Sequence, residues 1–191
     1  MTNNKFTIIS AYTKNTSYEK EVINLKDSLL KYDVNNYEII AFDSFGSWSR
    51  NCQYKAVLIK ESLKKYNHPI VWLDADAVLC KYPSLFHDID KDIAYCKLYG
   101  QVASGTLFFK PTELVFKIMD DWIKLNNINH NRFDQSCLFE VINKNNYKKM
   151  CYFLPIEYCK IFDLGPKCED PTIIHNQASR RFKKEINTKT S

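Results

Sequence analysis

Strand-like apolar runs alternate with helical periodicities through the first third of the chain, and this order constrains the fold more than any other feature. The runs are rich in β-branched and aromatic residues, and the segments between them repeat apolar residues at helical spacing. We expect strands at 6–11, 37–42 and 70–73, with helices carrying Val22, Leu25 and Leu29, then Ala56, Ile59 and Leu63. This order predicts an α/β fold with a mainly parallel sheet flanked by helices, and with ligands at the carboxyl ends of its strands.

The second half of the chain is less regular. We expect strands at 93–96, 107–109, 152–154 and 172–174, a helix that has Pro111 in its first turn, another helix over 134–143, and an irregular stretch over 155–171. No repeat or linker divides the sequence of 191 residues. We therefore expect one domain over 1–186, followed by a frayed polar tail over 187–191.

Composition excludes several classes of protein. The net charge of +5 is too small for a dedicated nucleic-acid binder, and an anionic small ligand fits it equally well. Because no apolar stretch reaches the roughly 20 residues of a membrane span, we expect a soluble, cytoplasmic protein. The seven cysteines form no C-x-x-C pair, which predicts reduced thiols that mostly fill core positions.

Two carboxylates, Asp74 and Asp76, interrupt the apolar run 71–79. In an extended backbone alternate side chains share a face, so both carboxylates are expected to point the same way. Two adjacent anions favour a hard divalent ion such as Mn²⁺ or Mg²⁺. The alternative is a loop in which an aspartate caps a helix.

His175 follows the apolar run 172–174, so we expect it at the carboxyl end of a strand. There its imidazole either has a structural role, as a lone histidine more often does, or completes the coordination begun by Asp76. A basic cluster follows His175 and consists of Arg180, Arg181, Lys183 and Lys184. It is interpreted either as a solvated tail or as a binding site for a diphosphate. We favour Ser179, Arg180 and Lys183 as phosphate contacts.

Two further segments each have a structural and a functional interpretation. Ser104-Gly105-Thr106 indicates either a plain turn or a bulge where a ligand approaches the backbone. Asp134 precedes a helical pattern and suits a helix N-cap, but its carboxylate also suits a general base for an acceptor hydroxyl.

These segments, in this order, resemble the Rossmann-like GT-A fold of glycosyltransferases that use nucleoside-diphosphate sugars. The likeness covers Ile8 to Lys183, and its nearest relatives are small single-domain members, including viral ones. The matching segments are the helix at 48–63, the D-x-D segment Asp74-Ala75-Asp76, the strand at 103–109, the Asp-Gln pair Asp134-Gln135, and the histidine loop at 174–183.

The resemblance implies a metal-dependent enzyme of the hexosyltransferase type. It would move a sugar from a UDP- or GDP-sugar to a hydroxyl of a glycan or glycoconjugate, with Mn²⁺ or Mg²⁺ held by Asp76 and His175, and Asp74 close by. The donor would contact Ala11, Tyr12 and Thr13 near the base, and Arg50, Lys55, Asp74, Ala75, Ser104, Gly105 and Gln135 elsewhere. Asp134 would act as base if the reaction inverts the anomeric centre, or position the sugar if it retains it.

Parts of this reading stay open. Trp48 and Tyr54 are expected to pack, and loops at 126–132 and 155–171 are expected to contact the acceptor. A sugar nucleotidyltransferase is a second possibility, although Ser10–Asn15 lacks the glycine of a phosphate loop. A basic nucleic-acid-binding module is a third, although the positive charge is scattered outside the C-terminal cluster.

Overall fold

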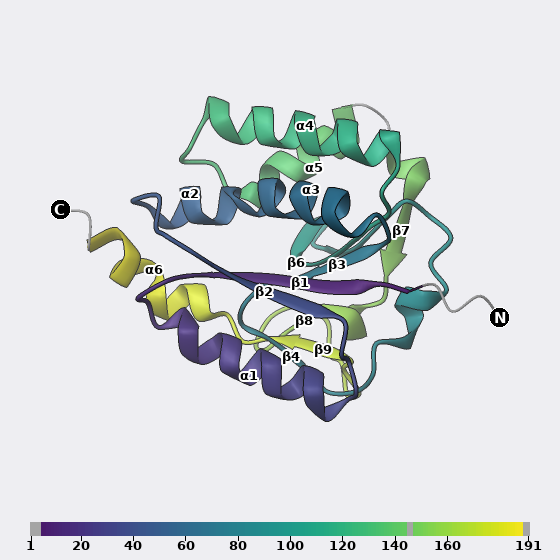
Figure 1. The fold of residues 1–191 in the computed structure, drawn as a ribbon, viewed down its shortest axis with the longest axis horizontal. Coiled ribbons are helices and arrows are strands. Elements are labelled where there is room, and N and C mark those ends of the chain that lie inside the picture. Colours follow the sequence, from purple (N-terminus) through teal and green to yellow (C-terminus); the bar gives the residue numbers. More distant parts are fainter. Residues whose placement is uncertain (1–4, 145–146, 189–191) are drawn as a thin grey trace.

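The chain folds into three layers in the computed structural model, which describes residues 5–144 and 147–188. Figure 1 shows a central sheet with helices on both faces. One face is covered by α2 (Trp48–Gln53), α3 (Lys55–Tyr66), α4 (Glu113–Ile128) and α5 (Asp134–Lys144). The other face carries α1 (Tyr18–Lys31), a small second sheet and α6 (Ala178–Thr188).

The central sheet has six strands in the order β2-β1-β3-β6-β5-β7. Their bounds are β1 Thr7–Thr13, β2 Tyr37–Phe42, β3 Ile70–Leu73, β5 Ile93–Leu98, β6 Gln101–Phe109 and β7 Cys151–Leu154. Among these strands only β6 runs against its neighbours. The predicted α/β fold with a mainly parallel sheet is therefore confirmed.

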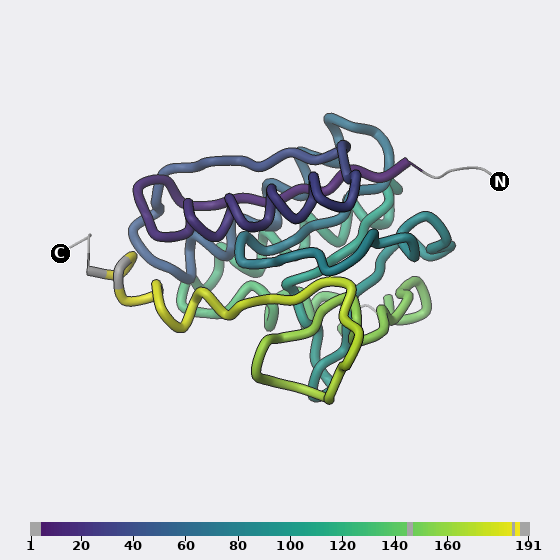
Figure 2. Tube along the Cα trace, turned by 90° about the horizontal axis from the view of Figure 1, so that it is seen from below, coloured from purple at the N-terminus to yellow at the C-terminus, as the bar shows by residue number. Residues whose placement is uncertain are grey.

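A second sheet of three short strands lies beside the first. It consists of β4 (Ala77–Leu79), β9 (Ile173–His175) and β8 (Lys160–Ile161), with β9 in the middle. Short 3-10 helices occupy Ser84–His87, Tyr147–Met150 and Ile156–Tyr158. Figure 2 shows the segment between β8 and β9 projecting from the rest of the molecule.

Each face of the central sheet buries its own apolar core. Ile59, Trp72 and Trp122 belong to the core under α3, α4 and α5, whereas Leu25 and Phe108 belong to the core beneath α1. All seven cysteines lie in the described ranges as free thiols, and Cys96, Cys137, Cys151 and Cys159 are buried. The expectation that the thiols mostly fill core positions is thus confirmed for these four.

Several element boundaries differ from the sequence-based expectation. β1 continues to Thr13 because Tyr12 and Thr13 pair with β2, so neither residue lies in a loop. Pro111 precedes α4, since the Thr112 hydroxyl accepts a hydrogen bond from the Val115 amide and caps the helix. The predicted tail at 187–191 lies outside the described residues from 189 onward, and Asn187 and Thr188 belong to α6. Within 5–144 and 147–188, no helix is both long and apolar enough to cross a membrane.

Candidate active site

Asp74 and Asp76 lie in a tight turn between β3 and β4, where the chain leaves the central sheet for the small one. The Ala77 amide donates to the Asp74 carbonyl at 2.9 Å, which closes the turn. The expectation that an extended backbone would align both carboxylates is therefore wrong. The two side chains still line one cavity, because the turn sits at the carboxyl end of β3.

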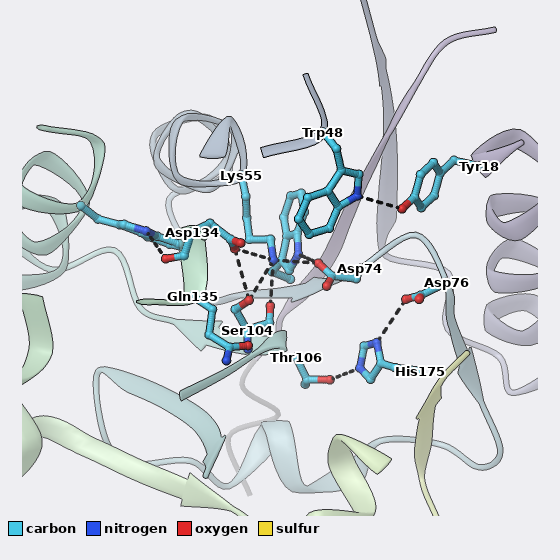
Figure 3. A network of polar contacts seen from close by, with 12 residues as sticks. Tyr18, Trp48, Lys55, Asp74, Asp76, Ser104, Thr106, Asp134, Gln135 and His175 are labelled. Atoms are coloured by element: carbon cyan, nitrogen blue, oxygen red, sulfur yellow. Dashed lines mark hydrogen bonds and ion pairs between the residues drawn. The ribbon is translucent and has the colours of Figure 1, made fainter. Parts of the chain in front are cut away.

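Strand pairing brings His175 to the second aspartate. β9 runs antiparallel to β4 with His175 opposite Ala77, and the Asn176 amide donates to the Asp76 carbonyl at 3.1 Å. As a result, the His175 Nδ1 atom lies 3.5 Å from the Asp76 Oδ1 atom (Figure 3). His175 thus ends a strand, as the sequence predicts.

The His175 ring is buried and held from behind. Its Nε2 atom lies 2.9 Å from the Thr106 hydroxyl, whereas Nδ1 finds no hydrogen-bond partner among the described residues. With its proton on Nδ1 the ring faces Asp76 as a donor, whereas with its proton on Nε2 it donates to Thr106 and offers the Nδ1 lone pair to a cation. A buried nitrogen that makes no hydrogen bond and lies beside a carboxylate oxygen is suited to bind a cation together with that oxygen.

Gly105 makes room for that ring. A Cβ atom added at Gly105 would lie 2.9 Å from the His175 Cε1 atom and 3.0 Å from Nδ1. Along β6, the pairing with β5 jumps from Leu107 to Ala103, so the residues between them form a bulge. The bulge at Ser104–Thr106 is therefore confirmed and the plain-turn alternative is wrong, and the group that approaches Gly105 is the His175 ring.

A buried lysine joins three functional segments. The Lys55 ammonium lies 2.9 Å from Asp74 Oδ1 and 3.0 Å from Asp134 Oδ2, and it donates to the carbonyl and hydroxyl of Ser104 (Figure 3). The Trp72 indole also donates to Asp74 Oδ1, at 2.8 Å. Only 6% of the Lys55 side chain is exposed. Two carboxylates compensate one cation that has been removed from water.

Burial and neighbouring charges move the pKa values of these groups. Burial opposes the charged form of Lys55, but Asp134 and Asp74 outweigh it and raise the pKa of the ammonium. Burial raises the pKa of Asp74 despite Lys55. Burial also acts to raise the pKa of Asp76, yet His175 and the Ala178 amide overcome it and lower that pKa. Asp76 therefore loses its proton at a lower pH than Asp74 does.

These groups surround a cavity of about 360 Å³. That volume lies in the usual range for a small-molecule site. Thirteen of the sixteen site residues expected from the sequence line it: Ala11, Tyr12, Thr13, Lys55, Asp74, Ala75, Asp76, Ser104, Gly105, Asp134, Gln135, His175 and Ser179.

The three remaining cations lie elsewhere. Arg50 lines a separate hollow of about 110 Å³ on the other side of α2. Arg180 pairs with Asp163 outside the cavity lining. Lys183 lies at the cavity rim, with its ammonium 4.9 Å from the ring centre of Trp48 and 5.3 Å from that of Phe133.

Helical spacing explains both Arg50 and several cavity residues that the sequence reasoning missed. Trp48, Asn51 and Cys52 precede Lys55 by seven, four and three residues, so they share its face and line the cavity. Arg50 lies on a different face with Gln53 and Tyr54. Counting back from Lys55 at helical spacing would have found the three lining residues. It would also have placed Trp48 at the cavity, where the sequence reading expected only packing.

Tyr18 and Phe133 also line the cavity without having been predicted. The Trp48 indole donates to the Tyr18 hydroxyl at 3.3 Å, and burial raises the pKa of Tyr18. The Phe133 ring contacts the Trp48 ring at 5.9 Å between centres. Tyr18 begins α1 and Phe133 precedes α5, so neither belongs to an apolar period that would signal that its side chain turns inward.

Asp76 and His175 can coordinate a divalent ion if a bound substrate supplies further ligand atoms. Asp76 offers a carboxylate and His175 an unpaired nitrogen, but no group of three or more histidine, cysteine or acidic residues capable of holding a metal occurs in the described part of the chain. Asp74 is instead engaged by Lys55 and Trp72. A site with two side-chain ligands suits an ion that completes its coordination with substrate phosphates and water.

The fold is shared with two solved structures. One is a glycosyltransferase involved in the glycosylation of the major capsid of PBCV-1, with a TM-score of 0.71 and 15% identity over 97% of this chain and 98% of that chain. The other is the WbbM bifunctional glycosyltransferase in its apo form, with a TM-score of 0.63 and 12% identity over 92% of this chain and 46% of that chain. No protein-family model matches the sequence. No curated protein matches it either. At these identities the likeness establishes a GT-A type fold.

Proposed function

We propose that this protein is a metal-dependent glycosyltransferase that moves a sugar from a nucleoside-diphosphate sugar to a hydroxyl of a glycan or glycoconjugate. The observation that carries the proposal is the convergence of Asp76 and His175 beside the Lys55, Asp74 and Asp134 cluster in one cavity. The shared fold of two glycosyltransferases supports it.

Asp76 and His175 are the proposed side-chain ligands of Mn²⁺ or Mg²⁺. The buried, unpartnered Nδ1 atom of His175 supports this assignment, and a nitrogen ligand favours Mn²⁺ because Mg²⁺ prefers oxygen. When bound, the ion supplies Lewis-acid neutralisation of the leaving diphosphate. The Ala178 amide donates to the second Asp76 oxygen at 2.8 Å, which fixes the carboxylate in place.

Asp134 is better suited to positioning the donor than to removing a proton. Its carboxylate is 8% exposed, contacts Lys55 at 3.0 Å and accepts a hydrogen bond from Ser104. Protonation of Asp134 would break this ion pair and leave Lys55 with Asp74 alone. Of the two roles expected from the sequence, the ion pair favours the one that belongs to a retaining reaction.

The nucleotide is proposed to lie on the β1 side of the cavity. Ala11, Tyr12 and Thr13 line that side at the carboxyl end of β1, as does Trp48 from α2. The Lys183 ammonium of α6 lies over the Trp48 and Phe133 rings at the cavity rim, from which it is proposed to reach a diphosphate.

A thermal-shift panel of UDP, GDP, CDP and dTDP, each with and without Mn²⁺, tests the proposal. One nucleotide should stabilise the protein in the presence of Mn²⁺, by about 2.7 kcal/mol at 100 times its Kd. A chelator such as EDTA should remove that gain. If none of the four nucleotides stabilises the protein with Mn²⁺, the proposed function is wrong.

Variants of the two metal ligands sharpen the test. Asp76→Asn retains an oxygen that can accept from the Ala178 amide, so α6 should stay in place while the Mn²⁺ dependence is lost. His175→Gln should lose the Mn²⁺ dependence as well. Asp170→Asn is a matched control, because Asp170 is an exposed carboxylate outside the cavity. A wild-type Mn²⁺ response in both site variants would refute the ligand assignment.

A further inference from the structure

Two aromatic side chains stand exposed on neighbouring loops at one edge of the cavity. Tyr99, in the turn between β5 and β6, is 78% exposed, and Phe162, just after β8, is 70% exposed. We propose that these two rings form a platform for a pyranose ring of the acceptor glycan. The inference deepens the proposed function, on which it rests, by assigning the side of the site that receives the sugar.

The two loops hold each other in a fixed arrangement. The Gly165 amide donates to the Tyr99 hydroxyl at 3.2 Å, and the Leu98 side chain fills the space that a Cβ at Gly165 would take. The Lys160 ammonium donates to the carbonyls of Leu164 and Pro166, which closes the 161–166 loop on itself. The exposed rings therefore stand on ordered backbone.

The platform continues the cavity on its His175 side. Ile161 lines the cavity and pairs with His175, and the Phe162 amide donates to the His175 carbonyl at 3.0 Å. Gln101, two residues after Tyr99, also lines the cavity. Since Tyr12 and Trp48 line the part proposed for the nucleotide, a sugar beyond the proposed metal ligands would face Gln101 and Ile161. An acceptor entering there would meet Tyr99 and Phe162.

The charges around the platform favour an uncharged occupant. Lys160 is engaged by two carbonyls, and Asp163 pairs with Arg180 of α6. Two large exposed rings, on loops that hydrogen-bond to each other beside a cavity, offer apolar surface to a bound molecule. A pyranose suits it, because one face of the ring presents C–H groups to an aromatic ring while its hydroxyls stay in water. Leu164, which is 38% exposed, adds apolar area to the same loop.

Saturation-transfer NMR on the full chain tests the platform, with methyl β-D-glucopyranoside, methyl β-D-galactopyranoside and methyl β-D-xylopyranoside as probes. Saturation should reach the C–H protons of at least one glycoside. Tyr99→Ala and Phe162→Ala should each reduce that signal about fivefold, because each removes one stacking ring. Phe162→Tyr keeps the ring and should keep the signal. Tyr82→Ala is the matched control, since Tyr82 is an exposed aromatic residue, 42% accessible, outside the cavity lining.

The nucleotide panel on the same variants separates this inference from the proposed function. Tyr99→Ala and Phe162→Ala should keep the wild-type response to nucleotide and Mn²⁺. The platform is refuted if no glycoside receives saturation from the wild-type protein, or if both alanine variants match it. A ring-dependent glycoside signal in a protein that binds no nucleoside diphosphate would support the carbohydrate site and contradict the transferase.

Discussion

Gly105 matters through the side chain that it lacks. The His175 ring occupies the space of a Cβ at this position, at 2.9 to 3.1 Å from three of its atoms. Because the ring is held on its other side by Thr106 and Asp76, it has little freedom to move away. The absence of a side chain at Gly105 thus determines where a proposed metal ligand, His175, can lie.

Gly105→Ala is expected to displace the His175 ring and weaken the Mn²⁺-dependent stabilisation by nucleotide. The thermal-shift panel measures this loss. Gly100→Ala is the matched control: Gly100 has φ of +79° and nothing within 4 Å of a Cβ, so its substitution strains the turn between β5 and β6 without crowding the His175 ring. Gly100→Ala should lower stability and keep the Mn²⁺ response. An unchanged Mn²⁺ response in Gly105→Ala would contradict the crowding argument.

Lys55 compensates two buried or half-buried carboxylates, so its loss should be costly. Lys55→Met keeps the length of the side chain but leaves Asp74 and Asp134 without their cation, and about 3–5 kcal/mol of stability should be lost. Denaturant titration measures the loss. Burial already raises the pKa of Asp74, and a raised folded-state pKa stabilises the protein at low pH and less so as pH rises.

The destabilisation of Lys55→Met should therefore shrink as pH is lowered toward the range in which aspartates protonate. Lys60→Met is a suitable control, because Lys60 pairs with the exposed Asp120 outside the cavity. A loss in Lys55→Met that is no larger than in the control, or that grows at acid pH, would show that the cluster is not held by charge.

At the scale of elements, the sequence predicts strands and helices better than it predicts what meets at their ends. The β2 bounds at 37–42 and the start of α5 at Asp134 agree with the structure, because apolar period and turn residues are local signals. The segment 74–76 is expected to be extended, but it forms a turn because the chain leaves the central sheet for the small sheet there. The pairing of β4 with β9 depends on residues far apart in sequence, which no local pattern encodes.

Local sequence patterns also fail to predict which cations line the cavity. Arg50 and Arg180 are close in sequence to Lys55 and Ser179, which line the cavity, but each lies on another side of its helix. Residue type and position in the sequence alone predict that all four of these residues contact a diphosphate. Helical phase separates them, and it is readable from the sequence once one residue of each helix is known to face the cavity.

Helix α6 is held by a few contacts at the cavity rim. Its first amide, that of Ala178, donates to Asp76, and the Phe182 ring packs against Tyr18 with 5.4 Å between centres. Phe182→Ala should accelerate hydrogen exchange about tenfold or more in 178–188 and leave the central sheet protected, because the helix packs at one edge. Phe153→Ala, outside the cavity lining, serves as control. Equal acceleration throughout the chain would contradict local release.

The whole molecule consists of two apolar cores that share one sheet. Ile59 of α3 and Leu25 of α1 are both fully buried, on opposite faces. This arrangement couples the layers, since every central strand contributes side chains to both cores. The GT-A type fold follows from that order of strands, and it places the turn at 74–76, β9 and the start of α5 around one cavity.

Ile59→Ala and Leu25→Ala should each lower the free energy of unfolding by about 2–5 kcal/mol in one cooperative transition. Urea titrations followed by tryptophan fluorescence and by circular dichroism should coincide in both variants. Ile23→Ala, at a position 57% exposed on α1, should change stability by less than about 0.5 kcal/mol. Separate fluorescence and dichroism transitions would mean that the two cores unfold independently.

The pairing of β4 with β9 also bears on how the protein is made. Asp76 and the Ala178 amide that fixes it are 102 residues apart in the chain. During synthesis the carboxylates of the D-x-D turn emerge long before His175, so a growing chain can build most of the central sheet while its cavity is still open on one side. The proposed binding of metal and nucleotide is thus the property that the protein would acquire last, and a chain shortened before β9 would lack His175 and with it the proposed site.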